Sequence, residues 1–194
     1  MKDLSYIENH IKEMLTEKRY QHSLGVQKTA IQLAKQYGAS IEKASIAALI
    51  HDCAKDLSIE QLLKHAAQFD IIIDDLTKFH PELLHGAVGA ALAKSLFSIH
   101  DEEIIDAVRY HTTGRSNMTM LDKIIYLADF IEPSRNFDGV DQLRAMASSN
   151  LDRATLMALE HTIYYVIKKS KLLHVDTIHA RNFLLLRQDG LEQE

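Results

Sequence analysis

Apolar residues recur every three to four positions along nearly the whole chain, which is the spacing that places them on one face of an α-helix. Helix-capping residues such as Ser40, Asp101 and Asn150 stand directly before segments with this helical spacing. The pattern predicts helices over residues 4–18, 19–37, 40–54, 82–97, 101–110, 119–131, 150–171 and 176–190, with a short one beginning at Ser58. Gly38 is suited to end the second of them.

Residues 71–73 are three consecutive isoleucines, which is a composition typical of a β-strand. The chain offers no second run of this kind to pair with them, so we predict a loop or a short turn. The expected fold class is therefore all-α, with residues 1–194 forming one domain.

The overall composition excludes several classes of function. The formal net charge is −5 and no run of lysine or arginine is present, which argues against binding to a nucleic acid polymer. A single cysteine, Cys53, excludes an internal disulfide and a thiolate metal cluster and is consistent with a reducing cytoplasm. The first residues show no signal-peptide pattern, and no apolar stretch approaches the roughly 20 residues of a membrane span. We expect a cytoplasmic protein.

His51 and Asp52 form the most informative pair, because they close the apolar helical run 45–50. Burying two polar side chains is costly unless a partner satisfies them, and a cation is an efficient partner. Neighbours on a helix point about 100° apart and normally face different surroundings. At the end of a helix, however, both can converge on an ion that lies over the last turn.

Asp129 is a second carboxylate in an apolar run, residues 124–131. Such a group must be neutral, ion-paired or metal-bound. The alternative to a metal site is a salt bridge to Arg135 or Lys123. The candidate metal ligands are His22, His51, Asp52 and Asp129. Together they supply two nitrogen and at least two oxygen donors, a set that favours Fe, Mn, Co, Ni or Zn over Ca.

His85 and His111 are a second tier of candidates. His85 precedes a face of very small residues, 86–91, which allows two backbones to approach closely or leaves room for a ligand. His111 is followed by residues 112–114, two threonines and a glycine, which offer donors for phosphate. The alternatives are tight helix packing and a plain helix end. The two histidines could bind a second metal ion or hydrogen-bond to phosphates. The remaining histidines, His161 among them, are predicted to be surface or structural residues.

Three basic residues lie close in sequence to the candidate metal ligands. Lys55 follows His51 by one helical turn, Arg19 precedes His22 by one turn, and Arg135 follows the helix of Asp129. Each could also be an ordinary solvated charge. Taken with the candidate ligands, they point to hydrolysis of a phosphate bond.

The ordered set His22, His51-Asp52, Lys55 and Asp129 resembles the HD-domain superfamily of metal-dependent phosphohydrolases, helical bundles with the metal site at the centre. Longer strings resemble the bacterial YqeK family of symmetrical diadenosine tetraphosphate hydrolases. The resemblance extends from about residue 5 to residue 187 and is carried by residues 19–26, 83–90, 111–114, 122–135 and 176–182.

The resemblance implies an enzyme that splits a bis(5′-nucleosyl) tetraphosphate into two nucleoside diphosphates with a metal, commonly iron, held by the four ligands. It also implies that a segment over residues 172–177, including His174 and Asp176, closes over the nucleotide. Val175 stands where the family's usual string has a proline, so the course of this segment is not predicted. The implied nucleotide or phosphate contacts are Arg19, Lys55, His85, His111, Thr112 and Arg135.

The expected reaction is attack of water on one of the two central phosphates. Asp52 would hold the ion and assist proton transfer, and Lys55 would neutralise charge on the leaving diphosphate. Two alternatives are another nucleotide phosphohydrolase on the same scaffold and a metal-dependent nucleotide sensor without activity. The number of ions, the preferred base and a homodimeric state are left open by the sequence.

Overall fold

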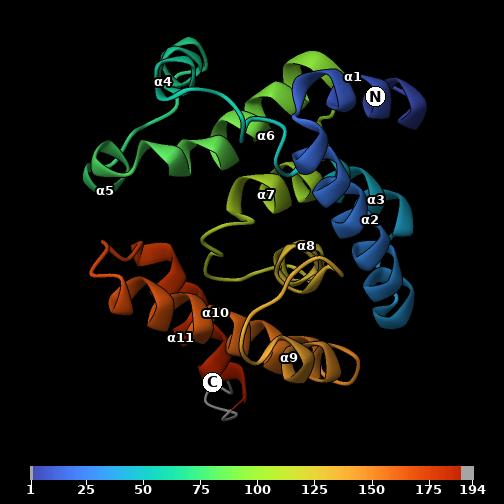
Figure 1. The fold of residues 1–194 in the computed structure, drawn as a ribbon, viewed down its shortest axis with the longest axis vertical. Coiled ribbons are helices and arrows are strands. Elements are labelled where there is room, and N and C mark those ends of the chain that lie inside the picture. The colour runs from blue at the N-terminus through green and yellow to red at the C-terminus, as the bar shows by residue number, and fades with distance from the viewer. Residues whose placement is uncertain (1, 189–194) are drawn as a thin grey trace.

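Helices account for all regular secondary structure in the described part of the chain, residues 2–188 of a computed structural model. The predicted all-α class is confirmed. The elements, shown in Figure 1, are α1 (Leu4–Met14), α2 (Glu17–Tyr37), α3 (Ile41–Ile50), α4 (Ile59–Gln68), α5 (Asp75–Phe79), the 3-10 helix η1 (Pro81–Leu83), α6 (Leu84–Phe97), α7 (Glu102–Tyr110), α8 (Met120–Ile131), α9 (Val140–Ala147), α10 (Leu151–Lys168) and α11 (Val175–Gln188).

The predicted capping residues begin their helices. Ser40 accepts a hydrogen bond from the backbone N–H of Lys43 at 3.2 Å. Ser58 and Gln61 exchange side-chain and backbone bonds in a capping box at the start of α4. Gly38 ends α2 with a φ of 71°, a left-handed conformation that glycine adopts without steric cost.

The first two predicted helices divide earlier than expected. The prediction extended the first to Lys18, but α1 ends at Met14 and Thr16 is the N-cap of α2. The backbone N–H and the hydroxyl of Thr16 both donate to Asp56 Oδ2, at 2.8 and 2.9 Å. This contact spans 40 residues, so local periodicity could not reveal it.

Two short helices were not predicted. Asp74 accepts a bond from Thr77 N and caps α5, directly after residues 71–73, which form no strand, as expected. Helix α9 follows a glycine with a φ of 92°. The prediction extended the helix from residue 150 to Lys171, but α10 ends at Lys168 and residues 169–171 do not belong to it. The predicted end of the last helix, Gly190, lies outside the described residues.

Helix α8 lies at the centre of the bundle, between α2, α3 and α7 on one side and α9 and α10 on the other (Figure 1). Ile124, Ile125 and Leu127 on α8 are completely buried. Burying each such side chain stabilises the fold by about 1.5–3 kcal/mol, so the position of α8 is well fixed. None of the helices in the described part has the length and apolar character needed to cross a membrane.

Candidate metal centre

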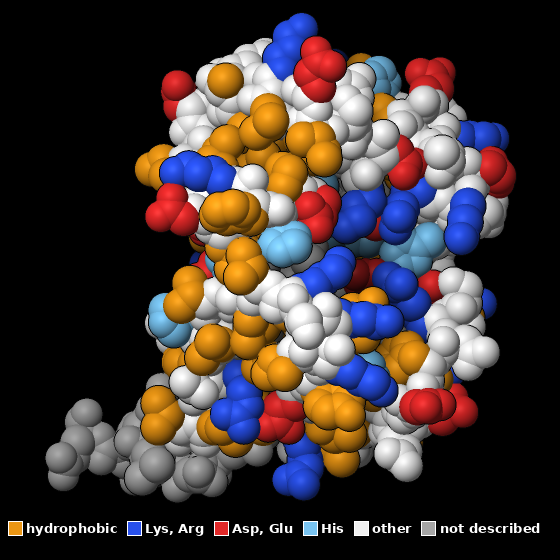
Figure 2. All heavy atoms as spheres, turned by 60° about the vertical axis from the view of Figure 1, so that its left-hand side comes forward, with side chains coloured by type: hydrophobic (Ala, Val, Ile, Leu, Met, Phe, Trp, Pro, Cys, Tyr) orange, Lys and Arg blue, Asp and Glu red, His pale blue; other side chains and the backbone are white. Residues whose placement is uncertain are grey.

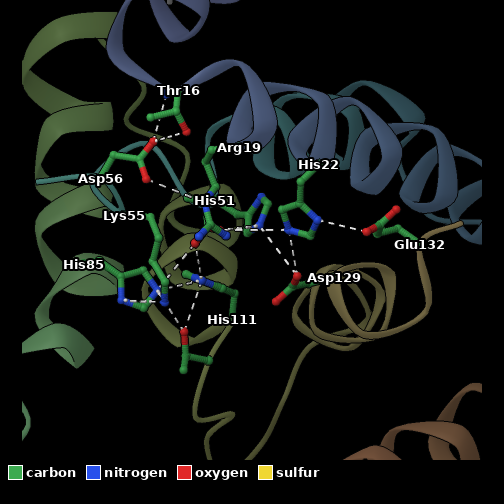
Figure 3. Close-up of polar contacts among 12 residues, drawn as sticks. Thr16, Arg19, His22, His51, Lys55, Asp56, His85, His111, Asp129 and Glu132 are labelled. Atoms are coloured by element: carbon green, nitrogen blue, oxygen red, sulfur yellow. Dashed lines mark hydrogen bonds and ion pairs between the residues drawn. The ribbon is translucent and has the colours of Figure 1, made fainter. Parts of the chain in front are cut away.

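Four histidines and two aspartates, supplied by five helices or their ends, converge at α8 (Figure 3). All six come from the predicted set, and the end of α3 explains how the neighbours His51 and Asp52 can both face the cluster. Helix α3 stops at Ile50, so the next two residues lie in a turn rather than on a continuing helix. The six are His22 on α2, His51 and Asp52 after α3, His85 on α6, His111 after α7 and Asp129 on α8.

Two groups of these residues have donor atoms close enough to share an ion. The donor atoms of His22, His51 and Asp129 lie within 4.8 Å of one another, and so do those of His51, Asp52 and His111. The Nε2 atom of His51 is 3.6 Å from Asp52 Oδ2 and 4.0 Å from Asp129 Oδ1. The structure therefore brings Asp129 to the His51-Asp52 corner.

Three of the histidine rings share one hydrogen-bonding arrangement, with Nδ1 facing a backbone carbonyl and Nε2 facing the centre of the cluster. A carbonyl oxygen only accepts, so Nδ1 carries the proton and Nε2 of the neutral ring keeps its lone pair. Nδ1 donates at 2.5–2.7 Å from His51 to Ala48, from His85 to Glu82 and from His111 to Val108.

These lone pairs lie too close together to be stable without a cation or a proton among them. The Nε2 atoms of His85 and His111 are 3.1 Å apart, and both lie within 3.5 Å of Asp52 Oδ1. Lys55 Nζ and Thr112 Oγ1, at 3.2 and 3.1 Å from His85 Nε2, can each donate there. His51 Nε2 is buried and has no hydrogen-bond partner among residues 2–188.

The donor set therefore fits a divalent transition metal. Neutral imidazoles and ionised carboxylates are its ligands, and hydrogen bonds from the far ring nitrogen orient such histidines. A cation would satisfy the otherwise unpaired nitrogen of His51, which no described side chain does.

The charge states of the cluster agree with this chemistry. Burial and the nearby His111 and Lys55 lower the pKa of His85 to about 3, and burial also lowers the pKa of His51. Burial alone would raise the pKa of Asp52, but the surrounding histidines outweigh it and hold that pKa well below its usual range. At neutral pH His51 and His85 are therefore neutral imidazoles, and Asp52 is a carboxylate.

His22 is held by a buried carboxylate that the sequence analysis did not single out. Its Nδ1 lies 3.0 Å from Glu132 Oε1, and its Nε2 lies 2.9 Å from Asp129 Oδ1. Burial alone would lower the pKa of His22, but hydrogen bonds to Asp129 and Glu132 outweigh it and raise that pKa. Glu132 is itself fixed by the backbone N–H and the hydroxyl of Ser134. The two carboxylates of Asp129 and Glu132 therefore favour positive charge at His22.

Two of the three predicted cations contact the carboxylates of the cluster. Arg19 Nη1 lies 2.8 Å from Asp52 Oδ2, and Arg135 pairs with the Asp129 carboxylate and donates to its carbonyl. The salt bridge from Asp129 to Arg135, predicted as the alternative to a metal site, is therefore formed, and Asp129 also contacts His22. The other alternative partner, Lys123, instead pairs with Asp152 at 2.6 Å.

The small-residue face beside His85 allows the close helix approach that was predicted. A Cβ atom added to Gly86 would lie 2.5 Å from the carbonyl oxygen of Arg109 on α7. No residue other than glycine fits there without a shift of backbone. The contact brings His85 on α6 next to His111 at the end of α7.

His174 and Asp176 lie apart from the six-residue cluster. His174 Nε2 is 3.4 Å from Asp74 Oδ2, and its Nδ1 accepts from Asp176 N. Both residues line a cavity of about 180 Å³. Thr112 also lines this cavity and hydrogen-bonds to His85, so it is the link to the cluster.

A larger cavity beside the cluster was missed by the sequence analysis. This aromatic cavity measures about 360 Å³ and reaches His111 and Asp129. Its rings lie on α8, on α10 and in the segment after α8; of these residues the sequence analysis considered only His161, as a surface or structural residue. The rings are Tyr126, Phe130, Phe137, His161 and Tyr165.

A second pocket opens on the other side of Arg135 and Phe137, which line both spaces. This polar pocket measures about 450 Å³ and reaches His22. Figure 2 shows Lys and Arg side chains gathered around a hollow with His and carboxylate side chains within it. The other lining residues of the polar pocket are Thr16, Lys18, Arg19, Glu132, Ser134 and Asn136.

Arg144 on α9 fixes the segment between the two spaces. Its guanidinium donates to the backbone carbonyls of Ile131, Glu132 and Arg135, at 2.9–3.1 Å. One side chain therefore holds the backbone that carries both Glu132 and Arg135.

Comparisons with known proteins agree with this geometry. A family model described as HD domain matches residues 19–134. The symmetrical bis(5′-nucleosyl)-tetraphosphatase of Bacillus subtilis (strain 168) is 42% identical over 175 residues, which are 90% of this chain and 94% of that protein. The protein of the same name in Staphylococcus aureus (strain NCTC 8325 / PS 47) is 38% identical and is aligned over 89% of each chain.

A solved structure is also similar over almost its whole length. It is described as a predicted HD superfamily hydrolase involved in NAD metabolism from Clostridium acetobutylicum. The TM-score is 0.93 at 46% sequence identity, and the match covers 96% of this chain and 99% of that one.

Proposed function

The chain belongs to the HD domain family, and from this premise we propose that it is a metal-dependent hydrolase that splits diadenosine tetraphosphate and related dinucleoside polyphosphates symmetrically into two nucleoside diphosphates. The observation that carries the proposal is the buried, unpaired Nε2 of His51 beside the carboxylates of Asp52 and Asp129, which fits a metal ion in the described structure. The relatives' shared name supports the substrate class.

We propose that His22, His51, Asp52 and Asp129 hold a divalent transition metal, with iron as the first candidate. Such an ion, when bound, supplies Lewis acidity to phosphate oxygens and lowers the pKa of water. His85 and His111 either hold a second ion through Nε2 or, once that nitrogen is protonated, donate to phosphate. Their position around Asp52 Oδ1 is compatible with both roles.

The cations have distinct tasks in this proposal. Lys55 is half-buried, and its ammonium lies against His85, so it is placed to neutralise charge on a phosphate near the cluster. Arg19 and Arg135 bind outer phosphate oxygens while they remain paired with Asp52 and Asp129. Asp52 accepts or returns the proton of the attacking water, and Thr112 hydrogen-bonds to phosphate.

The aromatic cavity supports a nucleoside substrate. A flat base stacks well between aromatic rings, and stacking is worth roughly 1–3 kcal/mol per base. The cavity includes His161 and Tyr165, which lie beyond residue 134, so we propose that residues 1–194 act as one domain. His174 and Asp176 are proposed to close over the nucleotide from the neighbouring cavity.

The sequence supplies the remaining parts of the proposal. A net charge of −5 supports a small nucleotide rather than a nucleic acid polymer or an anionic membrane as partner. We propose a cytoplasmic location. A homodimer is the assembly to test, by light scattering at several protein concentrations.

Product analysis tests the function directly. Diadenosine tetraphosphate incubated with the iron- or manganese-loaded protein should yield ADP alone, with metal content measured on the same preparation. AMP together with ATP would contradict symmetrical cleavage. Faster turnover of nucleoside triphosphates or cyclic nucleotides would favour another phosphohydrolase, and tight binding without turnover in any metal form would favour a sensor.

A further inference from the structure

Two spaces of unlike chemistry meet at the candidate metal ligands. The aromatic cavity ends at His111 and Asp129, and the polar pocket ends at His22. Arg135 and Phe137 form the wall between them. A substrate bound across the cluster therefore has one space available on each side of that wall.

The aromatic cavity has the character of a base-binding site. Phe130, Phe137 and His161 form mutual ring contacts, with centroids 4.7–5.7 Å apart, and Tyr126 stacks on Phe130 at 6.0 Å. Arg135 is its only lysine or arginine among residues 2–188. Ring faces and little charge suit a planar base rather than a phosphate.

The polar pocket has the opposite character. Lys18, Arg19 and Arg135 supply three cations, and Phe137 is the single phenyl or phenol ring that lines it in the described residues. Arg19 and Arg135 are anchored by carboxylates of the cluster. Lys18 is exposed and forms no ion pair with any residue of the described range, so its ammonium is free to bind an anion.

A symmetrical dinucleotide has two identical halves, but these two spaces are not equivalent. We propose that one half places its base in the aromatic cavity, while the polar pocket binds the other half through its two phosphates and ribose and does not read its base. This inference rests on the proposed function. It predicts that the enzyme recognises one nucleoside and a four-phosphate chain.

Removing the second nucleoside from the substrate tests whether the two spaces bind different parts of the dinucleotide. Adenosine 5′-tetraphosphate keeps one base and all four phosphates. Hydrolysis would break the P–O–P link between its second and third phosphates, with water supplying OH to one phosphorus and H to the other fragment, to give ADP and pyrophosphate. We expect kcat/KM within about tenfold of that for diadenosine tetraphosphate, and a larger loss, as for removing a stacked base, would overturn the proposal.

Two variants assign the halves to their pockets, with adenosine as a competitive inhibitor that lacks phosphate. Tyr165→Ala should raise the inhibition constant of adenosine roughly tenfold, because a stacking ring is lost. Tyr165 is half exposed, so the change should not impair folding. Lys18→Ala should raise KM for diadenosine tetraphosphate at least about threefold and leave adenosine inhibition unchanged.

Lys28→Ala is the matched control, because Lys28 is exposed on the same helix and lines neither space. It should leave both constants unchanged. An unchanged KM in Lys18→Ala, or weaker adenosine inhibition in that variant, would overturn the proposal. If the protein released no ADP from diadenosine tetraphosphate at all, the proposed function itself would fail, and this outcome differs from all of the above.

Discussion

Gly25 lies against the carboxylate of Glu132 so closely that a Cβ atom added to it would be 2.8 Å from Oε2. Both residues serve the same ligand, because Gly25 follows His22 by one turn of α2 and Glu132 accepts from the ring of His22. The absence of a side chain at residue 25 thus leaves space for the group that orients a proposed metal ligand.

Gly25→Ala should therefore lower stability and metal affinity. In a helix interior this change normally stabilises by about 1 kcal/mol, but displacement of a buried carboxylate should reverse the sign. Thermal unfolding and metal titration measure the two effects. In a Glu132→Ala background the same change should become stabilising, because the nearest atoms are gone. A stabilised Gly25→Ala single variant with unaltered metal affinity would contradict this interpretation.

Glu132→Gln tests the orientation of His22 without a change of shape. Carboxylates behind a metal-bound histidine typically contribute 10- to 100-fold in metal affinity, so we expect a loss of about that size. Competition with a chelator of known affinity measures it. Turnover at saturating metal should fall less than affinity does, and equal affinity in the variant and the parent protein would show that Glu132 is only a packing residue.

Asp129→Ala and His51→Ala should each abolish metal binding and hydrolysis together. Asp129 belongs to one of the two donor groups and His51 belongs to both, so each change leaves a group incomplete. Elemental analysis and product analysis on one preparation check this, with circular dichroism as a test of folding. Asp138→Ala, a change at an exposed acidic residue, is the matched control. Full activity in either ligand variant would remove the basis of the site.

Lys55→Ala should have a different outcome, with metal content retained and turnover lowered. Loss of a donor aimed at a reacting phosphate commonly costs about a hundredfold in turnover. Steady-state kinetics on metal-saturated protein measures the change. Lys64→Ala, at an exposed lysine of α4, should behave like the parent protein. Loss of metal together with activity would instead assign Lys55 a role in assembling the cluster.

The fold was predictable where the information is local. Helices with a side-chain cap and an amphipathic period were found, as α4 and α7 illustrate. The break between α1 and α2 depends on Asp56, 40 residues from Thr16, and the short α5 and α9 contain too few turns to show a period. These features follow from tertiary contacts that a single sequence does not display.

The same distinction applies to the candidate site. His51, Asp52 and Asp129 stand out because polar groups interrupt apolar runs, and the family suggested by these residues is confirmed by the comparisons. Glu132 and His161 gave no such signal. Their importance arises from what packs against them, namely His22 for the first and the rings of Phe130 and Phe137 for the second.

The clamp formed by Arg144 has an evolutionary consequence. Since one guanidinium binds three backbone carbonyls at the end of α8 and in the segment after it, mutations in that stretch would perturb metal affinity and phosphate recognition simultaneously. The far wall of the aromatic cavity, on α10, is exempt from this coupling. Substitutions that change the preferred base should therefore accumulate on α10, where they can alter base selectivity without altering the metal site.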